Sequence, residues 1–263
     1  MKFLFILLSP VLVFAKVHYA KVEPYESVVL KSAVSALVVD VDLDAEGTTV
    51  ASKKVIHLDD ALDIKNLTST KQSIILLGNM QKLNMEIEKS LSSTMSRQKS
   101  YYARINKMST ASKTQKDNAF SAYISAKSQY LNTKEKIVNL DKQILDLNYK
   151  KAQLLDSIEK KSIILKNKYL YKLIVREGDF VNFGSPLARV DDTGRAKLVL
   201  FLEPEELQDI EQKSVYLDDV KTEYKVDKVW NVADEKFISS YRAEIYIATP
   251  QHTFSKLMKV EIK

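Results

Sequence analysis

Carboxylate and imidazole side chains are the groups in this sequence that could bind a metal ion. Asp40, Asp42 and Asp44 alternate just ahead of a Glu-Gly pair, a spacing that superficially resembles a calcium-binding loop. A true EF-hand loop needs glycine at its sixth position and glutamate at its twelfth. Those two positions hold Ala45 and Ala51. We therefore reject a calcium loop.

The three histidines are His18, His57 and His252, and none has a partner at metal-ligand spacing. Isolated histidines of this kind are expected at the surface or on edge strands. The sequence predicts no metal site and no cofactor.

Catalytic patterns are missing as well. The carboxylate pairs Asp59-Asp60, Asp191-Asp192 and Asp218-Asp219 are adjacent in sequence. Adjacent strand residues point to opposite faces, so such pairs do not form an acid and base couple. The sequence has neither a Gly-x-Ser-x-Gly elbow nor a phosphate-binding glycine loop. We predict no catalytic residues, and the chain is not expected to be an enzyme.

The composition and the N-terminal segment exclude further kinds of site and indicate where the protein resides. The 263 residues include no cysteine, which excludes disulfides, thiolate metal sites and a lipid-modified N-terminal cysteine. Lys2 precedes a short apolar run that ends in Val13-Phe14-Ala15, the pattern of a secretory signal peptide over residues 1–15. The exported chain is expected to start near Lys16.

Positive charge is concentrated in one segment. The net charge is +6, yet residues 61–165 hold 18 Lys and Arg against 9 Asp and Glu. From Lys89 to Lys116 there are seven basic residues and no acidic one. An exported chain seldom meets nucleic acid, so we predict no nucleic-acid partner. A solvated helix face and an acidic protein partner stay open as explanations.

The segment 61–165 contains one glycine and no proline, and it predicts two long helices. In the second helix a heptad seam comprises Tyr123, Ala126, Tyr130, Thr133, Ile137, Leu140, Ile144, Leu147, Lys151, Leu154 and Ile158. In the first, the expected seam comprises Met80, Ile87, Thr94, Tyr101 and Met108, with Leu91 and Ile105 beside them. An antiparallel pairing would place Ile87 opposite Ile137 and Tyr101 opposite Tyr123.

The helical pattern breaks between Ser109 and Lys113. Ser112-Lys113-Thr114-Gln115 then fits a capping box that opens the second helix. Two similar helices joined by so short a turn form an antiparallel hairpin. At about 1.5 Å per residue, helices of roughly 45 residues give a rod of about 70 Å.

The segments that flank the hairpin resemble each other. Glu46-Gly47-Thr48-Thr49-Val50 before the hairpin corresponds to Glu177-Gly178-Asp179-Phe180-Val181 after it. Asp59-Asp60 and Asp191-Asp192 follow the two copies at nearly equal distance. Such a repeat predicts two half-motifs that form one β domain, with the hairpin inserted between them.

Together these features resemble the HlyD-type periplasmic adaptor, or membrane fusion protein, family. The resemblance rests on the paired Glu-Gly-x-x-Val motifs at Gly47 and Gly178 and on the Gly-x-Pro-Leu element at Gly184. It implies a biotinyl/lipoyl-like domain split by a helical hairpin and followed by a β-barrel. The lipoyl-lysine triplet is replaced by Asp59-Asp60-Ala61, so carrier chemistry is not expected.

The hairpin tip also resembles that of adaptors that dock to TolC-like channels. Such tips carry Arg, Leu four residues later, then Ser and Asp. Arg104, Met108, Ser112 and Asp117 follow this order, with Met in place of Leu and a shorter interval before Ser. The resemblance implies that these four residues bind the partner, while Gly47, Gly178 and Gly184 form structural turns of the lipoyl-like halves.

We therefore expect an α+β fold, an elongated adaptor. A signal peptide covers 1–15, and a lipoyl-like domain combines 16–60 with 166–195. A coiled-coil hairpin covers 61–165 and a β-barrel domain 196–263. A short helix is expected to start at Glu203-Pro204, where proline suits the first turn. The N-terminal strand is a candidate for a further strand of the barrel.

The expected role is that of the periplasmic adaptor of a tripartite efflux or secretion system. Its implied partners are an inner-membrane transporter (RND first, ABC second), a TolC-like outer-membrane channel and further copies of itself in a ring. The chain would reside in the periplasm and associate with the inner membrane through its transporter. The alternative is a coiled-coil oligomerisation or structural protein of the cell envelope.

Overall fold

A computed structural model describes residues 16–233, 239–248 and 254–263. The predicted signal peptide and His252 lie outside these described residues. The chain divides into two compact units. The β unit comprises the described residues of Met1–Ser32, Asp40–Ile56 and Ile164–Lys263, and the hairpin unit comprises Ala33–Val39 and His57–Ile163.

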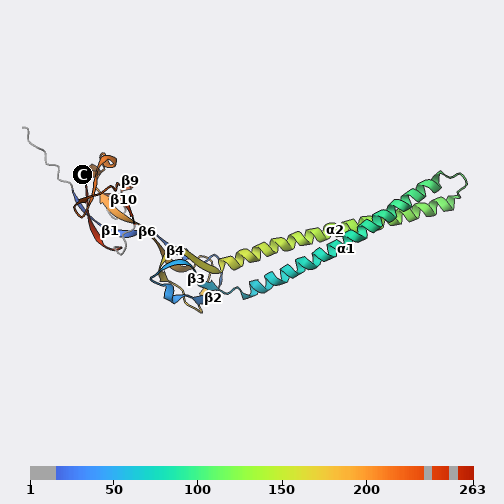
Figure 1. Ribbon diagram of the computed structural model, residues 1–263, viewed down its shortest axis with the longest axis horizontal. Helices are drawn as coiled ribbons and strands as arrows, with labels where there is room; N and C mark the ends of the chain where they lie inside the picture. The colour runs from blue at the N-terminus through green and yellow to red at the C-terminus, as the bar shows by residue number, and fades with distance from the viewer. Residues whose placement is uncertain (1–15, 234–238, 249–253) are drawn as a thin grey trace, which may run out of the picture. The chain divides into compact units, whose positions relative to one another are not determined.

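The hairpin unit is built on two long helices, α1 (Ala61–Lys107) and α2 (Lys113–Lys160), which run antiparallel to each other (Figure 1). The two long helices predicted over 61–165 are thus present, although the chain already leaves α2 at Lys160 and enters strand β4 at Ser162. No helix among the described residues is long and apolar enough to span a membrane.

Packing between the helices follows a heptad seam. In α2, every residue of the predicted seam from Tyr123 to Ile158 is at least partly buried. In α1, the shielded row is Leu67, Thr70, Ile74, Leu77, Gln81, Asn84, Glu88, Leu91, Met95, Gln98, Tyr102 and Ile105. This row alternates steps of three and four residues, as antiparallel helix packing requires.

The sequence-based seam of α1 is therefore wrong by one residue over most of its length. Ile87 is 50% exposed and Tyr101 is 47% exposed, so they do not form the expected inward-facing partners of Ile137 and Tyr123. Leu91 and Ile105 were placed correctly. The physical reason is that Gln81 and Glu88 occupy true seam positions, while Met80 and Ile87 beside them are apolar and give a stronger but misleading heptad.

Polar contacts close the base of the hairpin. The Asp63 carboxylate accepts hydrogen bonds from the Lys161 ammonium (2.8 Å) and the Ser157 hydroxyl (2.9 Å). The Leu58 amide donates to the Lys161 carbonyl at 2.8 Å. These bonds connect the residues at which the chain enters and leaves the helices.

The strands form one antiparallel network. They are β1 (Val17–Lys31), β2 (Ala36–Val41), β3 (Thr49–Leu58), β4 (Ser162–Leu173), β5 (Phe180–Val181), β6 (Pro186–Leu202), β7 (Val215–Leu217), β8 (Val220–Lys221), β9 (Lys228–Ala233), β10 (Tyr241–Ala248) and β11 (Leu257–Ile262). The order is β5-β2-β3-β4-β6-β1-β11-β7-β8, with β10 paired to β6 and β9. Three 3-10 turns complete the structure: η1 (Leu43–Ala45), η2 (Pro204–Leu207) and η3 (Ile210–Gln212).

Alternating apolar residues build the main core of the β unit. On β6, Ala196, Leu198, Leu200 and Leu202 are all buried, and β10 contributes Ala243, Ile245 and Ile247. Side chains two residues apart on a strand share a face, so these two buried rows lie next to each other on one face of the sheet. The first residues of β1 belong to the same core, because Ala20 and Val22 are buried there.

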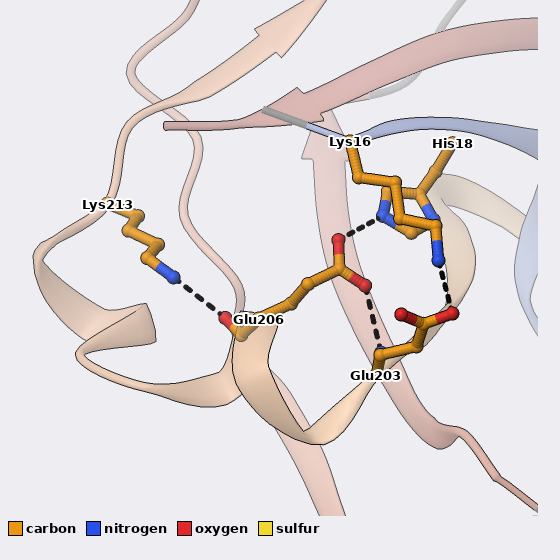
Figure 2. A network of polar contacts seen from close by, with 5 residues as sticks. All are labelled: Lys16, His18, Glu203, Glu206 and Lys213. Carbon is orange, nitrogen blue, oxygen red and sulfur yellow. Dashed lines mark hydrogen bonds and ion pairs between the residues drawn. The ribbon is translucent and has the colours of Figure 1, made fainter. Parts of the chain in front are cut away.

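The N-terminal strand joins the C-terminal strands, as the sequence allowed. Val17 to Lys21 of β1 pair with β11, and Val22 to Pro24 pair with β6. Figure 2 shows how side chains before and within β1 hold η2: the His18 ring contacts the Glu206 carboxylate at 2.6 Å, and Lys16 pairs with Glu203. Glu203 precedes Pro204, the first residue of η2, so the predicted helix start is confirmed.

The two repeated Glu-Gly turns lie in the same unit. Gly47 and Gly178 have φ of +78° and +89°, a backbone conformation that suits glycine. The Gly47 amide donates to the Leu170 carbonyl at 2.8 Å, which joins the segment before the hairpin to the segment after it. Gly184 has φ of +83°, and its amide donates to the Ser32 carbonyl at 2.8 Å.

Candidate partner-binding site at the hairpin tip

The hairpin tip is a short turn whose backbone is held from both sides. At the end of α1, the Met108 amide donates to the Ile105 carbonyl at 3.1 Å. At the start of α2, the Gln115 amide donates to the Ser112 hydroxyl (3.2 Å) and the Ser112 amide donates to the Gln115 side chain (2.9 Å). The predicted capping box is therefore present. It fixes the direction in which α2 leaves the turn.

An aromatic cluster holds the two helices together just behind the turn. Tyr102 stacks on Tyr123, with ring centroids 6.3 Å apart and an interplanar angle of 3°. Tyr102 also lies 5.2 Å from the Phe120 ring in a tilted arrangement. Ala119 and Ala126 are buried nearby, and these small side chains let the helices approach closely. The tip is thus a structured platform, held by the capping box at the turn and by ring packing behind it.

The four residues predicted to bind a partner are all exposed at this platform. Arg104 and Met108 are four residues apart around the end of α1, so they lie on one face. Met108 is 49% exposed, and Asp117 lies one turn into α2. Ser112 already uses its hydroxyl as a helix cap, so in this geometry its side chain serves the fold.

Arg97, which the sequence did not single out, shares a surface with Arg104. A shallow hollow of about 640 Å³ on the outside of α1 is lined by Ser93, Ser96, Arg97, Gln98, Ser100, Tyr101 and Arg104. Arg97 precedes Arg104 by seven residues, which places both guanidinium groups on one stripe of the helix. That spacing was the signal in the sequence that could have identified Arg97.

The charge of the tip is not balanced from within. Among the described residues, no ion pair includes a basic side chain of the stretch Lys89–Lys116. Exposed guanidinium groups can donate two parallel hydrogen bonds to a carboxylate or to carbonyl oxygens. The surface is therefore suited to an acidic or carbonyl-rich protein partner.

The described residues contain no group of three or more His, Asp or Glu side chains that could hold a metal ion. His18 contacts Glu206, and His57 contacts Asp60 at 3.4 Å and Ser162 at 3.3 Å. His57 thus has local contacts within the hairpin base.

Comparison with solved structures identifies the fold. MacA from Actinobacillus actinomycetemcomitans superposes with a TM-score of 0.73 at 13% identity, over 95% of this chain and 79% of MacA. The membrane fusion protein Spr0693 from Streptococcus pneumoniae R6 superposes with a TM-score of 0.58 at 7% identity, over 95% of this chain and 99% of that protein. No family model and no curated protein matches the sequence.

Proposed function

We propose that this chain, which has the fold of membrane fusion proteins, is the periplasmic adaptor of a tripartite export system. It would bridge an inner-membrane transporter to a TolC-like outer-membrane channel, with several copies in a ring. The observation that carries the proposal is an antiparallel hairpin of two helices, 47 and 48 residues long, that ends in a basic tip closed by a capping box. Such helices bury few residues outside the seam between them, so they add little to a core. Their length is best explained by the distance that the hairpin spans.

The remaining expectations fit this role. The β unit combines the segments before and after the hairpin, which is consistent with two lipoyl-like halves (16–60 and 166–195) followed by a barrel (196–263). A signal peptide over residues 1–15 would deliver the chain to the periplasm. The transporter class is expected to be RND first and ABC second, and the proteins that copurify with the chain from native membranes would decide between them.

Docking of the tip is the step that mutagenesis can test. Arg104, with Met108, Ser112 and Asp117 around it, would contact the end of the channel. We expect Arg104→Asp to abolish export and crosslinking to the channel, because a carboxylate would repel the acceptor groups that a guanidinium binds. Lys150→Asp is the matched control, since Lys150 is an exposed cation on α2 well away from the tip.

Circular dichroism would establish that both variants fold. Normal export and channel crosslinking by folded Arg104→Asp would refute docking through this residue. Loss of export by both variants would show that the overall charge of the hairpin matters rather than the tip.

A further inference from the structure

Both helices of the hairpin keep a second apolar row that the seam does not cover. On α1, Met80, Ile87 and Tyr101, here called the α1 stripe, are 46%, 50% and 47% exposed. On α2, Ile124, Leu131, Val138 and Leu145, here called the α2 stripe, are 42%, 49%, 64% and 69% exposed. Apolar side chains repeated at heptad spacing on a solvated surface indicate an interface rather than scattered exposure.

The two stripes lie on opposite faces of the hairpin. One residue along a helix turns the side chain by about 100°. Each α1-stripe residue precedes a seam residue such as Gln81 or Tyr102, and each α2-stripe residue follows one such as Tyr123. Gln81 pairs with Asp141 and Tyr102 contacts Phe120.

Asp141 and Phe120 lie three or four residues from members of the α2 stripe, so they are on the same face of α2 as the stripe. Because these two residues contact Gln81 and Tyr102, the α2 stripe is on the same face of the hairpin as Gln81 and Tyr102. In antiparallel helices, the residues just before Gln81 and Tyr102 then point to the other face. One copy of the hairpin therefore cannot bring its own two stripes together.

The stripes match each other level by level along the hairpin. Tyr102 stacks on Tyr123, which sets residues of α1 and α2 at the same height. By that register Tyr101 is level with Ile124, Ile87 with Val138, and Met80 with Leu145. Two hairpins placed side by side with their tips level would thus oppose an apolar residue to an apolar residue at three heptads.

We propose that the α1 stripe of one copy packs against the α2 stripe of the next copy, in this register. The contact is heterologous, because each copy contributes a different surface on each of its two sides. Such contacts propagate around a ring until it closes. This inference rests on the proposed function for the shared direction of the hairpins, and it names the residues through which the copies meet.

A second copy fits these surfaces better than another partner does. The matching rows extend over residues 80–101 and 124–145, or about 30 Å of helix at ~1.5 Å per residue. A partner that covered either row would need an antiparallel helix with apolar residues seven apart at the same heights. The other helix of this chain already has such a row. That row is on the opposite face of the hairpin, where it would meet a neighbouring copy.

Disulfide crosslinking tests the contact directly, because the chain has no cysteine of its own. Ile87→Cys and Val138→Cys would each be expressed in full-length chain, oxidised in whole cells and separated on non-reducing gels. We expect each single variant to stay monomeric on the gel. Coexpression of the two should give a dimer, and the double variant should give a ladder of higher species.

Lys89→Cys combined with Val138→Cys is the matched control, since Lys89 lies on the other flank of α1 and should give no ladder. Homodimers of Ile87→Cys alone would indicate a two-fold contact and overturn the proposal. A fast-migrating monomer from the double variant would show that the stripes share a face, and absence of any ladder would exclude this contact. None of these readouts depends on export, so they stand apart from the Arg104 test.

Discussion

Tyr102 of α1 stacks on Tyr123 of α2, with nearly parallel rings at a centroid separation of 6.3 Å. The neighbouring Tyr101, which the heptad pattern favoured, is 47% exposed instead. This pair of tyrosines fixes the register of the hairpin. The register differs by one residue from the one that the sequence predicted, in which Tyr101 faced Tyr123.

Tyr102→Ala should lower the free energy of unfolding of the hairpin by about 1–2 kcal/mol, because it removes a stacked ring and the packing around it. Tyr101→Ala is the matched control and should change the free energy of unfolding by less than about 0.5 kcal/mol. Urea unfolding followed by circular dichroism in dilute solution measures both. Equal losses from the two substitutions would contradict the register.

Ser112→Ala should cost about 1 kcal/mol of stability, because it removes the hydroxyl that accepts the hydrogen bond of the Gln115 amide. Ser112→Asp should keep most of that stability, since aspartate is also a good N-cap. If Ser112→Asp folds normally yet loses channel crosslinking, then Ser112 contributes to docking as well as to the cap. Thermal melts and crosslinking of the same samples separate the two roles.

Asp63 gives the hairpin base a defined pH dependence. The hydrogen bond from Lys161, supported by Ser157, lowers the pKa of Asp63 against the opposing effect of burial. Because the folded pKa lies below the unfolded value of about 4, the stabilisation is complete above that unfolded value. It is lost as the pH falls through the folded pKa.

Asp63→Asn should therefore destabilise the chain by about 1–2 kcal/mol at neutral pH, and this difference should shrink in acid. Asp146→Asn, at an exposed position of α2, should show neither effect. Denaturant titrations at a series of pH values would reveal the trend. A difference between wild type and Asp63→Asn that stays constant with pH would show that the carboxylate charge is irrelevant.

Glycine substitutions should act in opposite directions at two sites. Gly47→Ala should destabilise the chain by about 1–2 kcal/mol, because its φ of +78° disfavours a side chain although the space around it is open. Gly78→Ala, inside α1 and equally free of neighbours, should stabilise it by about 1 kcal/mol. A gain from Gly47→Ala in thermal unfolding would show that the turn can change its conformation.

The sequence predicted those parts of the fold whose signals are local. Ser112 and Gln115 predicted the start of α2, and Pro204 predicted the start of η2. The heptads of α2 predicted its seam from Tyr123 to Ile158. In each case one short stretch of chain contains both the residues and the cause.

The α1 seam could not be predicted in the same way, because two rows of that helix are apolar and only packing decides between them. Gln81 and Glu88 lie in the seam while Ile87 remains outside it, since the partner helix, and not hydropathy alone, selects the row. At the tip, the sequence identified Arg104 but not Arg97, and it assigned Tyr101 to the seam instead of to this surface. Their shared hollow depends on the side chains of three helical turns together.

The polar residues of the α1 seam have a mechanical consequence. Asn84 is buried and donates to the Met80 carbonyl of its own helix at 2.7 Å, while Gln81 reaches Asp141 across the seam. Sliding one helix past the other by a heptad would part Gln81 from Asp141 and unstack Tyr102 from Tyr123. The hairpin should therefore resist shear along its length, and a force applied at the tip would reach the base without slippage between the two helices.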